Sequence, residues 1–324
     1  MALPPLLQNL ALPVVGAPMF IISCPNLVIA QCKAGIVGSF PALNARPVEV
    51  LDRWLIQITE ELDRWNQENP ETPAAPYAVN QIVHRSNTRL EKDLEICVKH
   101  QVPITITSLG AREDVYKAVH SYGGIVFHDV TNNMYAQKAI SKGADGLIAV
   151  AAGAGGHGGT LSPFALISEI REWFHGPLLL SGALSTGAGI LAALALGADL
   201  AYIGSAFIAT EEANANPGYQ QALIDGVATD IVYTNFFTGI HGNYLRSSIE
   251  AAGLDPDHLS QSDPSKMNFG NKEIDGKKPW KDIWGCGQGI GSIKSVTTVS
   301  EYVAQLSSEY RQAIRRLWPD LAEK

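Results

Sequence analysis

The sequence predicts an α/β fold, namely a closed (β/α)8 barrel with a smaller appended region. Short runs typical of β-strands alternate with helix-length amphipathic stretches through the first two thirds of the 324 residues. Eight such units fit into roughly 210 residues, as a compact barrel requires. No G-x-G-x-x-G motif follows the first strand, which disfavours a doubly wound open sheet.

The expected strands and helices alternate along the chain. Each strand segment is a short apolar run, and the eight runs lie at residues 12–16, 35–39, 77–80, 104–107, 124–128, 146–150, 177–180 and 201–204. The clearest helices are longer and amphipathic, and they lie at residues 47–67, 87–100, 113–122, 132–142, 163–173 and 186–196. The segment 41–72 is larger than a compact barrel requires, so we expect it to cover the barrel or to form a subunit contact in a homo-oligomer.

The alternation stops after Phe207. Residues 214–296 hold clusters of aromatic residues, Gly, Asp and Pro with few clear strands, which indicates a smaller appended region. Within it, residues 255–280 are rich in Asp, Ser, Lys, Asn, Gly and Pro, and they are expected to form a solvent-facing loop.

A helical pattern returns near the C-terminus, where Tyr302, Leu306, Tyr310 and Ile314 are spaced by four residues. We expect this helix to pack back on the barrel. The predicted organisation is therefore a barrel over residues 1–212, an appended region over 213–296 and a C-terminal helix over 297–324.

Composition excludes several classes of protein. The 24 Lys and Arg against 32 Asp and Glu give a net charge of −8, which disfavours broad binding to nucleic acids or anionic membrane surfaces. The four cysteines are far apart, so neither a zinc site nor a disulfide framework is indicated. The apolar runs are shorter than the roughly 20 residues of a membrane span. We expect a cytoplasmic protein without a metal.

Two loops rich in small residues follow the last two expected strands. Ser181, Gly182 and Ala183 follow the seventh, and Gly204 and Ser205 follow the eighth. The loops after the strands of a parallel barrel gather on one face. Small residues leave backbone N–H groups accessible, and the following helix starts favour a dianion. Either loop alone could simply allow a tight turn, but together they indicate a phosphate site.

A third loop, residues 151–160, consists almost entirely of Gly and Ala apart from His157. Such a loop lets a flat ligand approach the backbone closely. Because the surrounding glycines cannot form a packed core, we expect His157 to point into the ligand space, where an imidazole can donate a hydrogen bond or transfer a proton. A purely structural histidine is the alternative.

Two more segments lie at expected strand ends. Ala17, Pro18 and Met19 place a rigid, apolar surface at the barrel mouth, suited to one side of an aromatic ring or simply to core packing. Asn80 ends the third strand and carries both a donor and an acceptor, which suits either the edge of a heterocycle or the capping of a turn.

The chain resembles the nitronate monooxygenase family, also called the 2-nitropropane dioxygenase-like family of FMN-dependent TIM barrels. The resemblance covers nearly the whole chain in the family's order, and the glycine-rich loop around His157 is its most specific part when joined to the run that leads into Gly204. The matching segments are Gly16-Ala17-Pro18-Met19, Tyr77-Ala78-Val79-Asn80, Ala154-Gly155-Gly156-His157-Gly158, Ser181-Gly182-Ala183, Ala193-Leu194-Ala195-Leu196-Gly197-Ala198-Asp199, Gly204-Ser205-Ala206-Phe207 and Gly287-Gln288-Gly289.

This resemblance implies noncovalent FMN. Its phosphate would be held by the two loops after the seventh and eighth strands, and its ring would lie over the segment that ends the first strand. The implied FMN-binding residues are Ala17, Pro18, Met19, Asn80, Gly155, Gly156, Ser181, Gly182, Ala183, Gly204, Ser205, Gln288 and Gly289, with Asn80 and Gln288 at polar edges of the ring.

The resemblance also implies a reaction. A nitronate, the anion of a nitroalkane, would give electrons to FMN, and O2 would complete its conversion to a carbonyl compound and nitrite. His157 would face this substrate, either protonated as an anchor for the anion or neutral as the base that removes the α-proton. Phe236, His241 and Tyr244 lie in the region that covers the substrate in the family, although an aromatic hinge would explain them equally well.

One position departs from the family. Many members carry a Lys near the end of the fifth strand that can contact the flavin, whereas this chain has Phe127-His128-Asp129-Val130. Asp129 would oppose negative charge on a reduced flavin, so it either points away or another group compensates it. His128 is expected to be a barrel-interior residue or one that supports the site from behind.

Three other functions stay open from the sequence, one of which is a flavin-binding protein without turnover. Related FMN barrels reduce quinones or enoyl thioesters with NAD(P)H, and this reductase activity is the main alternative. A phosphate-binding isomerase or synthase without redox chemistry is less favoured, because Lys residues and paired carboxylates are missing from the expected strand ends.

Overall fold

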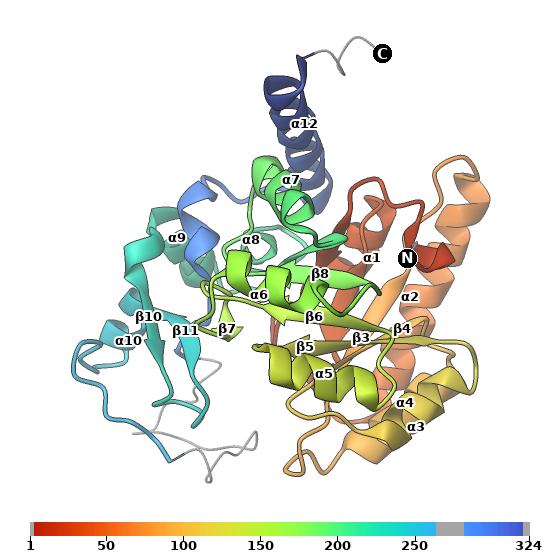
Figure 1. The fold of residues 1–324 in the computed structure, drawn as a ribbon, viewed down its shortest axis with the longest axis horizontal. Coiled ribbons are helices and arrows are strands. Elements are labelled where there is room, and N and C mark those ends of the chain that lie inside the picture. The colour runs from red at the N-terminus through yellow and green to blue at the C-terminus, as the bar shows by residue number, and fades with distance from the viewer. Residues whose placement is uncertain (1–2, 264–281, 320–324) are drawn as a thin grey trace.

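Eight parallel strands form a barrel and helices cover its outside, as Figure 1 shows. This is a computed structural model, and it describes residues 3–263 and 282–319. The order in the sheet is β1-β9-β8-β6-β5-β4-β3-β2, and a parallel bridge between Val15 and Val37 closes the ring. The predicted TIM-barrel fold is therefore confirmed. The strands are β1 (Val14–Gly16), β2 (Gly38–Pro41), β3 (Tyr77–Ile82), β4 (Ile104–Ser108), β5 (Ile125–Val130), β6 (Gly146–Val150), β8 (Leu178–Ser181) and β9 (Leu200–Ile203).

Strand β2 begins three residues later than the predicted second strand, because a turn occupies the expected start. Gly35 has a φ of 81°, and its N–H donates to the carbonyl of Cys32 at 3.0 Å. This turn ends α1 (Pro25–Lys33), a helix that was not among the clearest predictions. Most of the α1 side chains are buried, so the helix lacks the contrast between a polar and an apolar face that makes helices visible in a sequence.

The helices between the strands lie on the outside of the barrel. Two of them begin with a side-chain cap, in which Asn132 accepts from the N–H of Tyr135 and Thr186 accepts from the N–H of Gly189. Within the described ranges, no helix is both long enough and apolar enough to cross a membrane. Besides α1, these helices are α2 (Glu49–Glu68), α3 (Leu90–Lys99), α4 (Glu113–His120), α5 (Asn133–Ser141), α6 (Pro163–Arg171), α7 (Gly187–Leu196) and the short α8 (Ser205–Ile208).

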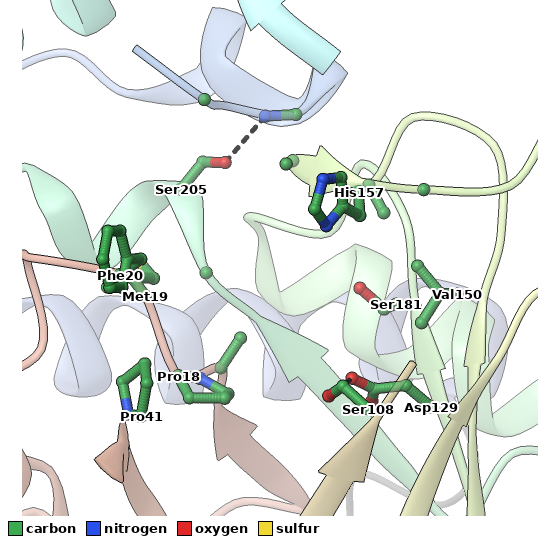
Figure 2. Close-up of a pocket in the computed structure, with 18 of the residues that line it drawn as sticks. Pro18, Met19, Phe20, Pro41, Ser108, Asp129, Val150, His157, Ser181 and Ser205 are labelled. Atoms are coloured by element: carbon green, nitrogen blue, oxygen red, sulfur yellow. Dashed lines mark hydrogen bonds between the residues drawn. The ribbon is translucent and has the colours of Figure 1, made fainter. Parts of the chain in front are cut away.

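Alternate residues of each strand face the barrel axis and the helices. In β5, Phe127 belongs to the interior cluster, whereas Val126 and Val130 pack outward against the helix layer. This alternation is the period-two pattern of a strand buried on both faces. The side chains at the carboxyl ends of the strands leave space for the cavity shown in Figure 2.

The appended region forms a small antiparallel sheet beside the barrel (Figure 1). Strand β10 (Ile231–Thr234) pairs with β11 (Gly242–Leu245), and β11 pairs with β7 (Gly156–His157), which lies in the loop after β6. Helix α10 (Arg246–Ala251) contacts β11, and helix α9 (Pro217–Asp225) precedes the sheet in the chain. Of the predicted loop 255–280, residues 255–263 form no helix or strand, and residues 264–280 lie outside the described ranges.

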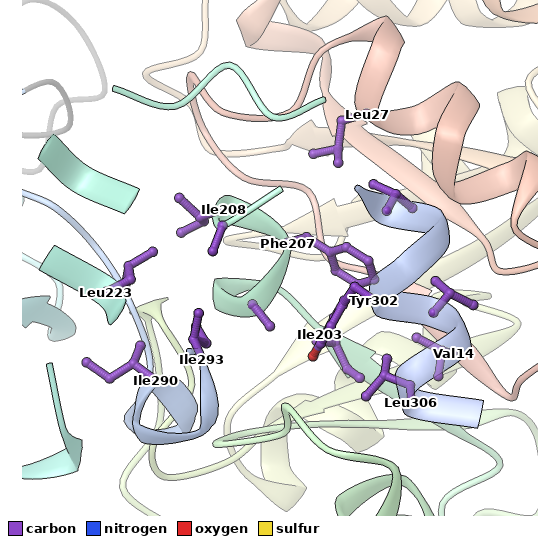
Figure 3. Packing of buried hydrophobic residues seen from close by; sticks show 14 of the residues in the cluster. Val14, Leu27, Ile203, Phe207, Ile208, Leu223, Ile290, Ile293, Tyr302 and Leu306 are labelled. Carbon is purple, nitrogen blue, oxygen red and sulfur yellow. The ribbon is translucent and has the colours of Figure 1, made fainter. Parts of the chain in front are cut away.

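Helix α12 (Val299–Leu317) packs against α7 and α1. It begins with a capping box, in which Thr298 and Glu301 each accept a hydrogen bond from the other's backbone N–H. Figure 3 shows Tyr302 and Leu306 directed from this helix toward Phe207 and the barrel strands. Phe207 and Tyr302 meet edge to face, with ring centroids 5.2 Å apart.

We expect Gly187→Ala to destabilise the fold by about 1–3 kcal/mol, because a side chain at this position overpacks the contact between α7 and α12. A Cβ atom at Gly187 would collide with the backbone of Tyr310 and Leu306. Urea denaturation measures the change. Gly291→Ala is the control, since its nearest neighbour would be the Cα of Val227 at 3.9 Å, and it should change the free energy of unfolding by no more than about 0.5 kcal/mol.

Candidate active site

A cavity of about 1190 Å³ opens at the carboxyl ends of the barrel strands. Residues from the ends of most barrel strands line it, together with loops of the appended region. This is the face on which the loops of a parallel barrel gather, and where TIM-barrel enzymes place their sites. Ser181, Gly182, Ala183, Gly204 and Ser205 all line the cavity, so the structure brings the two predicted loops together.

These two loops expose backbone rather than side chains. Gly182 and Ala183 have positive φ angles of 141° and 54°, which turn the chain sharply after β8. At Gly204 an added Cβ atom would make ordinary van der Waals contacts, 3.4 Å from the Cβ of Ala17 and 3.8 Å from the Sδ of Met19, so this position has room for a side chain. Such a cradle of N–H groups can bind an anion.

The loop at residues 285–289 borders the same end of the cavity as these two loops. The N–H of Gly287 donates to Ser205 Oγ at 2.8 Å, the contact dashed in Figure 2. Ser185 Oγ donates to the carbonyl of Gly289 at 2.8 Å. A Cβ atom at Gly155 would lie 2.7 Å from the nitrogen of Gly287, so glycine permits the backbones to pack directly against each other.

The segment after β1 forms one wall of the cavity. The N–H of Ala17 donates to the carbonyl of Ile203 at 2.8 Å, and the N–H of Met19 donates to Ser23 Oγ at 2.9 Å, so the segment is fixed at both ends. Figure 2 shows Pro18 and Met19 on the opposite side of the cavity from Val150 and His157. A flat ligand fits between these walls.

Three polar side chains from adjacent strands form the floor of the cavity. Asn80 Nδ2 donates to Ser108 Oγ at 2.7 Å, and Ser108 Oγ donates to Asp129 Oδ2 at 2.5 Å. Burial raises the pKa of Asp129 to about 7, although the hydrogen bond from Ser108 opposes this shift. Asp129 lines the cavity, and the group that compensates its charge is the hydroxyl of Ser108.

His128, the neighbour of Asp129, points the other way. Its Nδ1 lies 2.7 Å from Thr107 Oγ1 and 3.1 Å from the hydroxyl of Tyr116 on α4. The barrel-interior alternative does not hold for this side chain, because successive residues of a strand face opposite sides, and the alternative of a residue that supports the site from behind stays open.

His157 is fixed by the pairing of β7 with β11. Its Nε2 lies 2.8 Å from Thr238 Oγ1 in the appended region, and its backbone pairs with Gly242. The imidazole is partly buried and lines the cavity. Desolvation lowers its pKa to about 4, so it is neutral at pH 7.

The other predicted residues are placed differently. His241 lines the cavity and stacks on Tyr233, with centroids 5.0 Å apart. Phe236 and Tyr244 are not part of the lining, since both pack against Phe237. Tyr244 instead supports the site from behind, where its buried ring packs against Phe237 and its hydroxyl interacts with Thr238.

Gln288 is also displaced from its expected place. It is exposed and outside the lining, and its backbone N–H donates to the carbonyl of Gly153 at 2.9 Å. The glycines on either side of Gln288 do line the cavity, as do Asn80, Gly155 and Gly156.

Sequence reasoning missed several lining residues. Ser108 is the last residue of β4, and Asn80 lies near the end of the neighbouring strand β3. Its place at a strand end could therefore have identified Ser108 as a lining residue. Ile21 and Leu109 carry no such signal. Both line the cavity with positive φ angles of 69° and 64°, a strained conformation for a side chain of this size that concentrates at functional sites.

Comparison with known proteins identifies the family. The model of the nitronate monooxygenase family matches residues 5–309. This chain belongs to the nitronate monooxygenase family. It is therefore an oxidoreductase, and the predicted resemblance is confirmed. The nitronate monooxygenase of Paraburkholderia phytofirmans is 27% identical, over 94% of each chain.

Two solved structures share the fold of this family member. FabK from Thermotoga maritima has a TM-score of 0.76 at 20% identity, with 97% of each chain covered. The nitroalkane oxidase from Streptomyces ansochromogenes has a TM-score of 0.75 at 20% identity, with 97% of this chain and 100% of that chain covered.

We expect His157 to titrate far below the ordinary value of 6.5, near its lowered pKa of about 4. The folded protein then binds this proton less tightly than the unfolded chain does. The contribution of neutral His157 to the free energy of unfolding is therefore complete above pH 6.5 and is lost as the pH falls toward 4. NMR of ¹⁵N-labelled imidazoles measures the titration. His258 is the internal control, because its hydrogen bond to Asp255 raises its pKa. A His157 signal that titrates together with His258 contradicts the placement.

Proposed function

We propose that this chain is an FMN-dependent nitronate monooxygenase, which converts alkyl nitronates and O2 to carbonyl compounds and nitrite. The observation that carries the proposal is the place of His157. A neutral imidazole, fixed by β7 and Thr238, faces the wall formed by Pro18 and Met19 across one cavity. A planar cofactor and a small substrate together fill such a space.

The residues present fit FMN. The N–H groups of Gly182 and Ser205 would hold its phosphate, because this end of the cavity is lined by backbone, whereas the N–H of Ala183 donates to the carbonyl of Gly153 at 3.3 Å. Pro18 and Met19 would support one face of the ring. At the floor, Asp129 Oδ1 is buried without a hydrogen-bond partner among the described residues, as expected where a ligand completes the set.

Bound FMN would supply the electron acceptor that the protein side chains lack. The task of His157 is then to recognise the substrate beside the ring. Its low pKa makes the imidazolium form scarce at pH 7, so of the two roles that the sequence left open, the neutral one is favoured. A neutral imidazole can remove the α-proton of a nitroalkane, or donate one hydrogen bond to a nitro oxygen of the nitronate.

The remaining residues of the site hold this geometry and limit water. Thr238 fixes the orientation of the imidazole, and Tyr244 in turn contacts Thr238 from the buried side. Apolar side chains at the rim, including Phe20, Ile21 and Val150, give a setting that admits O2 and strengthens hydrogen bonds to the anion.

Anaerobic mixing tests the proposed function directly. We expect the purified protein to be yellow and to release FMN on denaturation, and its bound flavin to bleach with an alkyl nitronate but not with NADH or NADPH. Bleaching by NADH or NADPH alone would assign the protein to the reductases. A colourless protein that cannot be loaded with FMN would contradict both assignments and favour a non-redox barrel.

His157→Ala should keep FMN and slow flavin reduction by the substrate about 10²- to 10⁴-fold, the usual contribution of a positioned acid or base. Stopped-flow absorbance under anaerobic conditions measures the rate. His258→Ala removes an exposed imidazole outside the cavity and serves as the control. An undiminished rate in His157→Ala would remove this residue from the mechanism.

Gly204→Asp should abolish retention of FMN, because it places a carboxylate beside the proposed phosphate position. Gly204→Asn is the matched control, since it has the same size without the charge, and it should retain considerably more cofactor. The backbone at Gly204 has a φ of −114°, which either side chain can adopt. The FMN content of the two variants after gel filtration, measured by absorbance, shows whether they differ in FMN retention. Equal loss in both variants would mean that steric crowding, not charge, decides binding.

A further inference from the structure

The floor of the cavity contains a carboxyl group that the proposed chemistry does not use. Asp129 Oδ2 accepts the hydrogen bond from Ser108, and Asp129 Oδ1 is buried without a partner among the described residues. Ser108 in turn accepts from Asn80, so the carboxyl group ends a chain of hydrogen bonds across β3, β4 and β5. A buried charged oxygen left unpaired is costly, so this arrangement favours a carboxyl group that can take up a proton.

No cation in the described part of the chain balances this carboxyl group. Burial is the largest influence on its pKa, and the hydrogen bond from Ser108 is the only opposing one. Burial, together with the nearby Asp129, raises the pKa of Tyr202 on β9 well above its usual value. The phenol therefore stays neutral. The two side chains that interact with Asp129, Ser108 and Tyr202, therefore carry no charge at pH 7.

The other titratable groups of the cavity come from surrounding elements. His157 on β7 is neutral at pH 7, and His128 faces α4. The remaining lining groups are His84 after β3, Tyr135 and Lys138 of α5, Tyr219 of α9, His241 before β11 and Asp282. None of them contributes to the shift at Asp129, whose causes are burial and Ser108 alone.

On the basis of the FMN binding proposed above, we propose that Asp129 is a proton-binding group that faces the flavin and couples the flavin's reduction potential to pH. Electron uptake makes a flavin ring more negative. An ionised carboxylate beside the ring opposes this change in a low-dielectric cavity, whereas a neutral carboxylic acid does not. Asp129 consequently holds its proton more tightly when the flavin is reduced.

Reduction of the flavin is coupled here to the protonation of one carboxylate. The reductant supplies two electrons. In one pH range Asp129 is ionised beside oxidised flavin but protonated beside reduced flavin. Within that range, the solvent supplies one additional proton to Asp129. No bond to the protein forms or breaks except the O–H bond of Asp129. The reduction equilibrium constant then changes by one additional factor of ten per pH unit, which is about 30 mV for a two-electron couple.

The test is a potentiometric titration of the FMN-loaded protein at several pH values between about 5.5 and 8.5, around the raised pKa of about 7. Dithionite is the reductant, and redox dyes report the potential. Wild type and Asp129→Asn should agree at the low end, because both groups are neutral there. Through the range, the wild-type potential should fall by about 30 mV per pH unit more than that of Asp129→Asn, which leaves Asp129→Asn easier to reduce at the high end.

Two further variants sharpen the test. Ser108→Ala removes the hydrogen bond that stabilises the carboxylate, so the range of steeper dependence should move to higher pH. Asp114→Asn removes an exposed carboxylate from α4 and should follow wild type, which controls for net charge. If Asp129→Asn does not fold, Ser108→Ala alone decides, and an unchanged range overturns the inference.

The outcomes separate the two proposals. Bound FMN with parallel pH dependence in wild type and Asp129→Asn overturns the role of Asp129 and leaves the proposed function intact. A protein that binds no FMN overturns the proposed function, and the inference falls with it. Bound FMN with a steeper dependence only in chains that keep Asp129 supports the role of Asp129 and the FMN binding on which it rests.

Discussion

The pairing of two short strands from distant parts of the chain determines the geometry of the site. Strand β7 lies in the loop after β6, and β11 belongs to the appended region, yet their backbones pair over Gly156 and His157. Without this pairing, His157 would lie on a glycine-rich loop with few side-chain contacts to fix it. The contact with Thr238 then orients a side chain whose backbone is already in place. The barrel therefore supplies the cavity, and the appended region supplies the position of the imidazole.

Direct contact between backbones stabilises the opposite end of the cavity. The loops at residues 153–155, 183–185 and 285–289 meet where Gly155, Gly287 and Gly289 carry no side chain. A Cβ atom at Gly289 would lie 3.0 Å from the carbonyl oxygen of Ala183, and one at Gly287 would collide with Gly153. Glycine is needed here for close approach, and backbone hydrogen bonds from Ala183 and Gln288 to the carbonyl of Gly153 join the three loops.

Features of the fold and the site that depend on local sequence could be predicted, whereas those that depend on contacts between separate segments could not. The barrel, the glycine loops, Asn80 and His157 follow from strand alternation and from position at a strand end, which are local properties. Helix α1 was missed because burial on most sides removes its periodicity. Phe236 and Tyr244 were assigned to the lining, although both pack behind it, because residues 213–296 have no regular pattern that shows which side chains face inward. The contact between Ser108 and Asp129 depends on the register of adjacent strands, which the sequence does not reveal.

The long separation between His157 and its support affects how the protein acquires activity. Thr238 lies 81 positions further along the chain, so the two residues meet only after the intervening β8, α7, β9 and α9 have been placed. Contacts of such high sequence separation carry a large loop-closure cost and form late. Recovered turnover is therefore a stricter measure of renaturation than recovered helix content. A chain with a complete barrel but an undocked appended region would have normal circular dichroism in its helices, and its His157 would not be in place.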